Sequence, residues 1–192
     1  TDQAIESFEA SVRMDPAHAF AYYNLGLARS QVGDFQSAIK NFQKAIELKP
    51  GEAYFHYNLG RAYARMGDLD GCIAQFQRAI HLDPNDPYTH NNLGMAYFQM
   101  GRFEQSVQEF HKAIDLDPND AEVHYNLGLV FARLGKLGAA RGEFSTAVDL
   151  EPEDPRSHFE LGNIHARLGN FDEANKRYQR AIELDPNLSE AH

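Results

Sequence analysis

Cysteine, tryptophan and long apolar runs are scarce or absent in this sequence. Its 192 residues include one Cys and no Trp, and 18 Lys and Arg face 28 Asp and Glu. A single thiol excludes an internal disulfide framework and a zinc site built from several cysteines. No apolar run approaches the roughly 20 residues of a membrane-spanning helix. The net charge of −10 argues against a nucleic-acid-binding protein, which usually carries a basic surface.

A 34-residue period runs through the sequence and organises its prolines, glycines and aromatic residues. It accounts for 6 of the 8 prolines and 10 of the 14 glycines. The periodic prolines are Pro16, Pro50, Pro84, Pro118, Pro152 and Pro186. The periodic glycines are Gly26, Gly60, Gly94, Gly128 and Gly162, and Gly33, Gly67, Gly101, Gly135 and Gly169. The aromatic anchors are Phe42, Phe76, Phe110, Phe144 and Tyr178. Each period therefore reuses one packing solution, as in a solenoid.

Within one period, residues 53–86, the apolar spacing predicts two helices. The first helix is expected to end near Met66, with Gly67 in the left-handed conformation that follows many helices. Asp68 can then cap the second helix by accepting a backbone hydrogen bond. Pro84 ends the second helix, because proline cannot continue the helical hydrogen-bond ladder. The sequence thus predicts an all-α protein.

The pattern of this period resembles the tetratricopeptide repeat (TPR), which has the same length. The matching residues are His56, Leu59, Gly60, Tyr63, Cys72, Phe76 and Pro84. The resemblance implies a right-handed superhelical solenoid of antiparallel helix pairs. We expect one solenoid over residues 1–192 with five full repeats, at 19–52, 53–86, 87–120, 121–154 and 155–188. Residues 1–18 are expected to be the second helix of a preceding repeat and 189–192 the start of a further one, which indicates a piece of a longer solenoid.

By the same resemblance, one stripe of each first helix lines a concave groove that binds a partner. The candidate peptide-binding residues are Asn24, Asn58, Asn92, Asn126, Tyr54, Tyr57, Arg61, Arg65, Tyr88, Phe98, Tyr125 and Arg133. Over all five repeats the stripe carries five Arg and two Glu, so we expect a groove charge of +3 on an acidic body. This favours an extended protein or peptide segment that is neutral to acidic.

Four of these residues, Asn24, Asn58, Asn92 and Asn126, recur at the repeat period. An amide side chain offers two donors and an acceptor, which match the groups of an extended peptide backbone. The row is similar to the asparagine ladder in the repeat domain of O-linked N-acetylglucosamine transferase. The alternative is that asparagine is a tolerated polar residue copied by repeat duplication.

Two glycines outside the periodic series, Gly138 and Gly142, lie four residues apart on the second helix of the fourth repeat. They fall outside the apolar stripe of that helix, and each costs it about 1 kcal/mol relative to Ala. They either allow another backbone to approach this helix closely or are tolerated residues that lower its helix propensity.

No catalytic or cofactor-binding motif stands out, so we expect a non-enzymatic interaction scaffold without a cofactor. His56, His90, His124 and His158 are interpreted as packing residues rather than metal ligands, because neighbouring helices lie roughly 8–10 Å apart. We expect no metal site, no nucleic-acid partner and no membrane insertion. Two alternatives remain: a structural solenoid that self-associates through its ends, and the recognition arm of an enzyme whose catalytic domain lies outside this sequence. One thiol, expected to be buried, favours a reducing cytoplasmic compartment.

Overall fold

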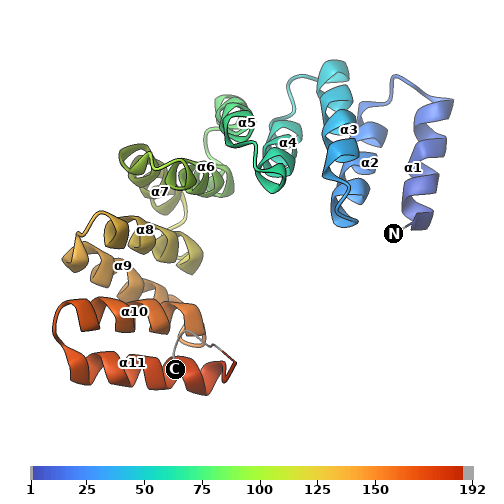
Figure 1. Ribbon diagram of the computed structural model, residues 1–192. Helices are drawn as coiled ribbons and strands as arrows, with labels where there is room; N and C mark the ends of the chain where they lie inside the picture. The colour runs from blue at the N-terminus through green and yellow to red at the C-terminus, as the bar shows by residue number, and fades with distance from the viewer. Residues whose placement is uncertain (1, 188–192) are drawn as a thin grey trace. The chain divides into compact units, whose positions relative to one another are not determined.

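A computed structural model describes residues 2–187, and within that range the chain forms eleven α-helices and no strand (Figure 1). The predicted all-α fold is therefore confirmed. The chain divides into two compact units, the first ending at Met100 and the second beginning at Gly101. The helices of unit 1 are α1 (Asp2–Met14), α2 (Ala19–Gln31), α3 (Phe35–Leu48), α4 (Ala53–Met66), α5 (Leu69–Leu82) and α6 (Pro87–Gln99). Those of unit 2 are α7 (Phe103–Leu116), α8 (Ala121–Arg133), α9 (Leu137–Leu150), α10 (Pro155–Arg167) and α11 (Phe171–Leu184). The expected repeat start at 189–192 lies outside the described residues.

The helix ends follow the predicted turn chemistry. Gly67, directly after α4, has a φ of 78°, a left-handed conformation that side-chain-bearing residues rarely adopt. The Asp68 carboxylate accepts a hydrogen bond of 2.9 Å from the Gly71 N–H and so caps α5. Asp86 and Asp154 cap α6 and α10 in the same way, directly before a proline in the first turn.

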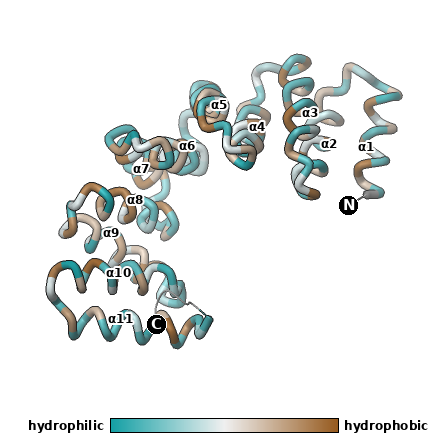
Figure 2. Tube along the Cα trace, in the orientation of Figure 1, coloured by the Kyte–Doolittle hydropathy of each residue, from teal (hydrophilic) through white to brown (hydrophobic). Residues whose placement is uncertain are grey.

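Helix packing within each unit is sequential, so that a helix contacts the helices before and after it in the chain. In unit 1, α3 packs between α2 and α4, and α5 packs between α4 and α6. The buried rings of Phe42 and Phe76 supply the centre of these contacts. In unit 2, α9 packs between α8 and α10 around Phe144. Hydrophobic and hydrophilic residues are interspersed along each helix, as expected for amphipathic elements (Figure 2).

The repeated histidines are buried within the packed helices and have hydrogen-bond partners. The Nδ1 atom of His56 lies 2.8 Å from the side-chain oxygen of Gln75, and that of His124 lies 2.8 Å from a carboxylate oxygen of Glu143. Each pair joins the two helices of one repeat, which agrees with the predicted packing role. Among the described residues, no three His, Cys, Asp or Glu side chains are grouped to hold a metal ion. In the same part of the chain, no helix combines the length and apolar character needed to cross a bilayer.

Candidate functional site

A groove of about 640 Å³ lies in unit 1 and is lined by residues of α2, α4 and α6, with parts of the intervening helices. Ten of its residues come from the stripes that the sequence assigned to the binding surface: Leu27, Ser30, Gln31, Asn58, Arg61, Ala64, Arg65, Asn92, Met95 and Gln99. The buried residues Ala62, Cys72, Phe76 and Ala96 also border it. The structure therefore brings the predicted stripes of three helices into one cavity.

Among the described residues, the only charged side chains that line this groove are Arg61 and Arg65, one turn apart on α4. Each guanidinium lies over an aromatic ring. The Cζ of Arg61 is 5.6 Å from the centroid of Tyr57, and the Cζ of Arg65 is 4.9 Å from the centroid of Phe35. Such cation–π contacts favour particular positions of long side chains without neutralising their charge. The groove therefore presents two positive charges and no carboxylate of its own.

The asparagines of α4 and α6 lie at the groove but already use their N–H groups. The Nδ2 of Asn58 donates to the hydroxyl of Tyr23 at 3.0 Å and to the backbone oxygen of Tyr54 at 2.9 Å. The Nδ2 of Asn92 makes the equivalent bonds to the Tyr57 hydroxyl at 3.3 Å and to the Tyr88 backbone oxygen at 2.7 Å. The two donors of each of these asparagines are therefore already used within the chain, one by a tyrosine of the preceding repeat and one by the backbone of its own helix.

The remaining two asparagines of the row have different surroundings. Asn24 is half-buried on α2 and is not among the residues that line the groove. Asn126, on α8 of unit 2, is only 5% exposed. The four asparagines therefore share a sequence position without sharing one environment.

Three aromatic candidates of unit 1, Tyr54, Tyr88 and Phe98, belong to the predicted stripes but are not among the residues that line the groove. Tyr54 is 39% exposed and contacts Tyr23 edge-to-face, with 5.1 Å between ring centroids. Tyr88 is 59% exposed, and Phe98 is half-buried on the same helix. These rings provide apolar area beside the groove that a bound segment can cover.

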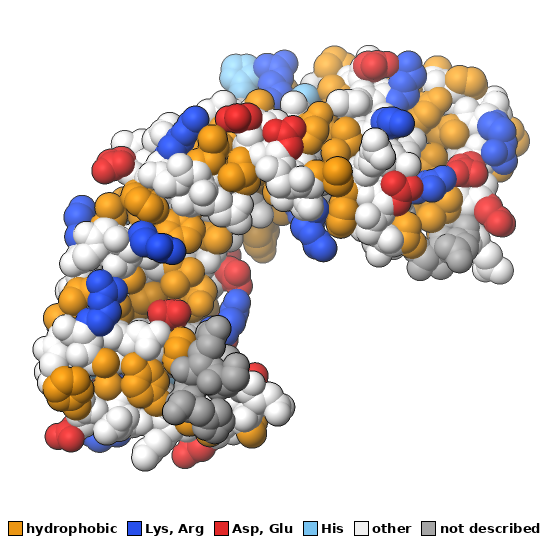
Figure 3. Space-filling view, in the orientation of Figure 1, with side chains coloured by type: hydrophobic (Ala, Val, Ile, Leu, Met, Phe, Trp, Pro, Cys, Tyr) orange, Lys and Arg blue, Asp and Glu red, His pale blue; other side chains and the backbone are white. Residues whose placement is uncertain are grey.

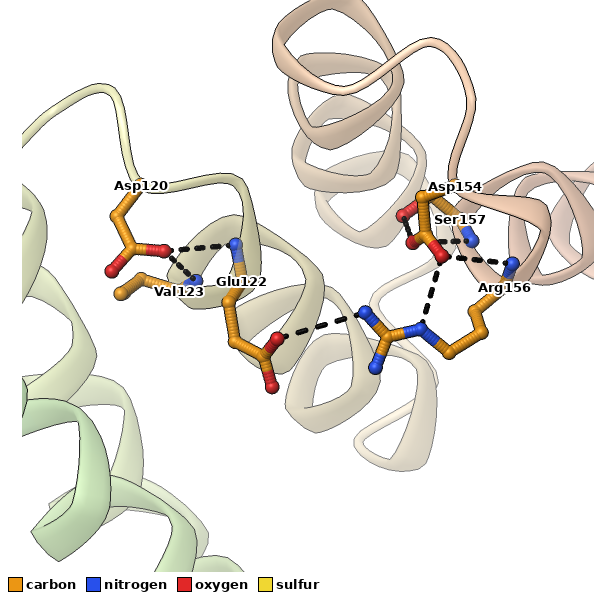
Figure 4. Close-up of polar contacts among 6 residues, drawn as sticks. All are labelled: Asp120, Glu122, Val123, Asp154, Arg156 and Ser157. Atoms are coloured by element: carbon orange, nitrogen blue, oxygen red, sulfur yellow. Dashed lines mark hydrogen bonds and ion pairs between the residues drawn. The ribbon is translucent and has the colours of Figure 1, made fainter.

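In unit 2 the predicted basic stripe is partly neutralised. Arg156 of α10 pairs with Glu122 of α8 at 3.6 Å and with Asp154 at 3.0 Å (Figure 4). Its Cζ also lies 5.1 Å from the ring centroid of Tyr125, and burial raises the pKa of Tyr125 to about 12. Acidic and basic side chains are interspersed on the face drawn in Figure 3. Arg133 is exposed at the end of α8. Arg156 in unit 2 is thus paired with carboxylates, whereas Arg61 and Arg65 of α4 line the groove of unit 1 without a carboxylate among its described lining residues.

Family models described as TPR repeat match residues 29–67, 60–101 and 94–135, and models described as tetratricopeptide repeat match residues 121–154 and 155–188. Together these matches cover most of the chain. The chain belongs to the tetratricopeptide repeat family. TPR proteins are protein-interaction scaffolds that bind protein or peptide partners, and a fold made of TPRs alone is typically non-catalytic.

Solved TPR structures share this fold over most of their length. A structure of MamA has a TM-score of 0.79 and 25% sequence identity, covering 84% of this chain and 95% of the other. YrrB, described as a TPR protein with an unusual peptide-binding site, has a TM-score of 0.78 and 22% identity over 98% and 97% of the two chains. PilF of Pseudomonas aeruginosa has a TM-score of 0.81 and 23% identity over 92% and 80%. No curated protein matches the chain.

The sequence analysis of this TPR chain missed the role of Tyr23. The candidate set included Tyr57 and Tyr125, which occupy the same position of their repeats, but not Tyr23. In the structure its hydroxyl is the partner of Asn58. The available signal was the repetition of a tyrosine directly before the asparagine, at Tyr23, Tyr57 and Tyr125.

Proposed function

We propose that this TPR chain is a non-catalytic scaffold that binds an extended peptide segment along the groove of unit 1. The observation that carries the proposal is the lining of this groove. Its described residues combine amide and hydroxyl side chains with two arginines and include no carboxylate. Peptide backbones need hydrogen-bond partners along their whole length, and the polar lining offers them at the spacing of the repeats.

The charge of the groove defines the class of segment. Arg61 and Arg65 favour acidic or phosphorylated side chains, because a guanidinium binds carboxylate and phosphate oxygens through paired N–H groups. The exposed rings of Tyr54 and Tyr88 supply apolar contact area next to these charges. The proposed partner is therefore an extended segment, neutral to acidic, with apolar side chains beside its acidic ones.

The test is a binding comparison by fluorescence anisotropy. We expect peptides of about ten residues, selected by display on this chain, to be rich in Asp and Glu. The double variant Arg61→Ala, Arg65→Ala should bind them about tenfold or more weakly, since a hydrogen bond to a charged group contributes about 1.5–3 kcal/mol. The double variant Asn58→Ala, Asn92→Ala should also lose affinity. Arg78→Ala on α5, exposed and outside the groove lining, is the control. Wild-type affinity in both folded double variants contradicts the proposal.

A second candidate function, self-association, rests on the exposed end of unit 2. Phe171, the first residue of α11, is 67% exposed, and nearby Leu168 is 39% exposed. The equivalent residue four repeats earlier, Phe35 in unit 1, is half-buried and has Arg65 over its ring. We expect light scattering to show concentration-dependent dimers that Phe171→Ser abolishes and the control Val32→Ser leaves unchanged. A wild-type chain that stays monomeric at high concentration rejects this candidate.

A further inference from the structure

The orientation of the Asn58 side chain is fixed by its partners. One partner is the backbone oxygen of Tyr54, which can only accept a hydrogen bond. The amide nitrogen therefore faces that oxygen, and its second hydrogen points to the Tyr23 hydroxyl at 3.0 Å. Both N–H groups of Asn58 are thus in use.

The same arrangement recurs one repeat later with Asn92, which donates to the Tyr88 backbone oxygen and to the Tyr57 hydroxyl. In each case the tyrosine and the asparagine lie 35 residues apart, on the first helices of consecutive repeats. We call these two hydrogen-bonded couples, Tyr23 with Asn58 and Tyr57 with Asn92, the Tyr–Asn pairs.

Each Tyr–Asn pair keeps one hydrogen-bond donor and one acceptor that no described residue uses. The tyrosine hydroxyl accepts from the asparagine, so its own hydrogen is still available, and no described residue accepts it. The Oδ1 of each asparagine likewise receives no hydrogen bond from a described residue. A pair therefore offers one donor and one acceptor side by side, the combination that a peptide unit with its C=O and N–H requires.

The hydroxyls remain protonated donors at neutral pH. Burial raises the pKa of Tyr23 and of Tyr57. The positive charge of Arg61 lowers both pKa values but only partly offsets the effect of burial. Arg61 lines the groove together with Asn58 and Asn92, the asparagines of the two pairs. It also lies over the ring of Tyr57, at 5.6 Å from the centroid.

We propose that the Tyr–Asn pairs are the groups that bind the peptide backbone. The hydroxyls of Tyr23 and Tyr57 donate to peptide carbonyls, and the Oδ1 atoms of Asn58 and Asn92 accept from peptide N–H groups. Arg61, in the same groove, holds an acidic side chain and thereby sets the register of the segment. This inference rests on the proposed peptide-binding function and assigns the donor role to the tyrosines instead of the asparagines.

The corresponding positions of unit 2 hold different residue types. The residue 35 positions after Tyr125 is Glu160, whose negative charge contributes to the raised pKa of Tyr125. The next position of the tyrosine series holds Phe159, which has no hydroxyl. Backbone binding of the proposed kind is therefore assigned to unit 1.

The experiment uses a fluorescein-labelled peptide of about ten residues, with two central Asp residues in a Ser and Gly background. Fully extended, it spans roughly 33 Å. We expect the double variant Tyr23→Phe, Tyr57→Phe to bind this peptide about three- to tenfold more weakly than wild type, as for the loss of one or two neutral hydrogen bonds. Replacing one backbone amide of the peptide by an ester should lower affinity for wild type at the contacted positions.

The matched control is Tyr63→Phe. Its hydroxyl also accepts an amide N–H, from Gln43 at 3.0 Å, but Gln43 does not line the groove, whereas Asn58 and Asn92, the partners of Tyr23 and Tyr57, do. We expect this variant to bind like wild type. Thermal unfolding of all variants, followed by circular dichroism, confirms that they are folded.

The outcomes separate this inference from the proposed function. If the tyrosine double variant binds like wild type while Arg61→Ala, Arg65→Ala loses affinity, the Tyr–Asn pairs do not bind the backbone and the groove remains the binding site. If wild type binds the Asp peptide no better than a peptide with Lys in its place, the proposed function and the inference both fail.

Discussion

Cys72 borders the groove of unit 1, yet its side chain is fully buried. Burial raises the pKa of its thiol to about 11, and the nearby carboxylate of Asp68 acts in the same direction. The reactive form of cysteine is the thiolate, so a thiol with this pKa is protonated and unreactive at neutral pH. The residue thus acts as a small apolar side chain in the core, as the sequence suggested.

We expect Cys72 to resist alkylation in the folded chain. With a pKa of about 11, its thiolate fraction at pH 8 is roughly 100-fold below that of an unperturbed thiol, and burial slows the reaction further. Mass spectrometry after iodoacetamide treatment should show slow modification at pH 8 and rapid modification in urea. Because the folded thiol keeps its proton to higher pH than the unfolded one, its contribution to stability is present below pH 9 and lost as the pH rises towards 11. Equal alkylation rates with and without urea contradict this assignment.

Two glycines on adjacent helices show that the contribution of a glycine to stability depends on what packs against it. A Cβ atom on Gly128 of α8 would lie 2.7 Å from the Phe144 ring of α9, so this glycine permits the two helices to approach closely. Gly138 of α9 is exposed, and a Cβ atom there would meet nothing within 4 Å. The first glycine is required by a contact, while the second only weakens its own helix.

Substituting these glycines by alanine should therefore have opposite effects on the free energy of unfolding. Gly138→Ala should stabilise the chain by about 1 kcal/mol, the helix-propensity difference between the two residues. Gly128→Ala should destabilise it by about 1–3 kcal/mol, the usual cost of overpacking. Urea unfolding monitored by circular dichroism measures both. A destabilising Gly138→Ala would instead support a notch at which another backbone approaches.

At the scale of the whole molecule, the net charge does not predict the charge of the segment that the groove is proposed to bind. The chain carries −10, but the groove of unit 1 is lined by two arginines and no carboxylate. In unit 2, Arg156 is compensated by Glu122 and Asp154. Attraction of the proposed acidic segment would therefore depend on the local field at α4, within the roughly 8–10 Å over which charges act at physiological salt.

Most of the fold could be predicted because its determinants are local and repeated. Gly67, Asp68 and Pro84 end or start helices through interactions within a few residues, and the period repeats the same chemistry. The stripe that lines the groove follows from helical spacing, which places Asn58, Arg61 and Arg65 on one face.

The chemistry of the groove could not be predicted in the same way, because it depends on partners in other repeats. The N–H groups of Asn58 are occupied by Tyr23, 35 residues earlier, and Arg156 is neutralised in part by Glu122. Sequence spacing indicates which residues share a helix face, but not which of their donors, acceptors and charges remain available.

The bond between Tyr23 and Asn58 crosses a repeat boundary, and its 35-residue offset equals one period plus one residue. Duplication or deletion of a whole period leaves this offset intact, whereas an insertion in an inter-helix turn changes it. Copying a whole period therefore keeps the order of residues that places a tyrosine beside the asparagine of the next repeat. A longer version would gain one Tyr–Asn pair with each added copy that carries both residues, and with it one more position of the kind proposed to contact a peptide backbone.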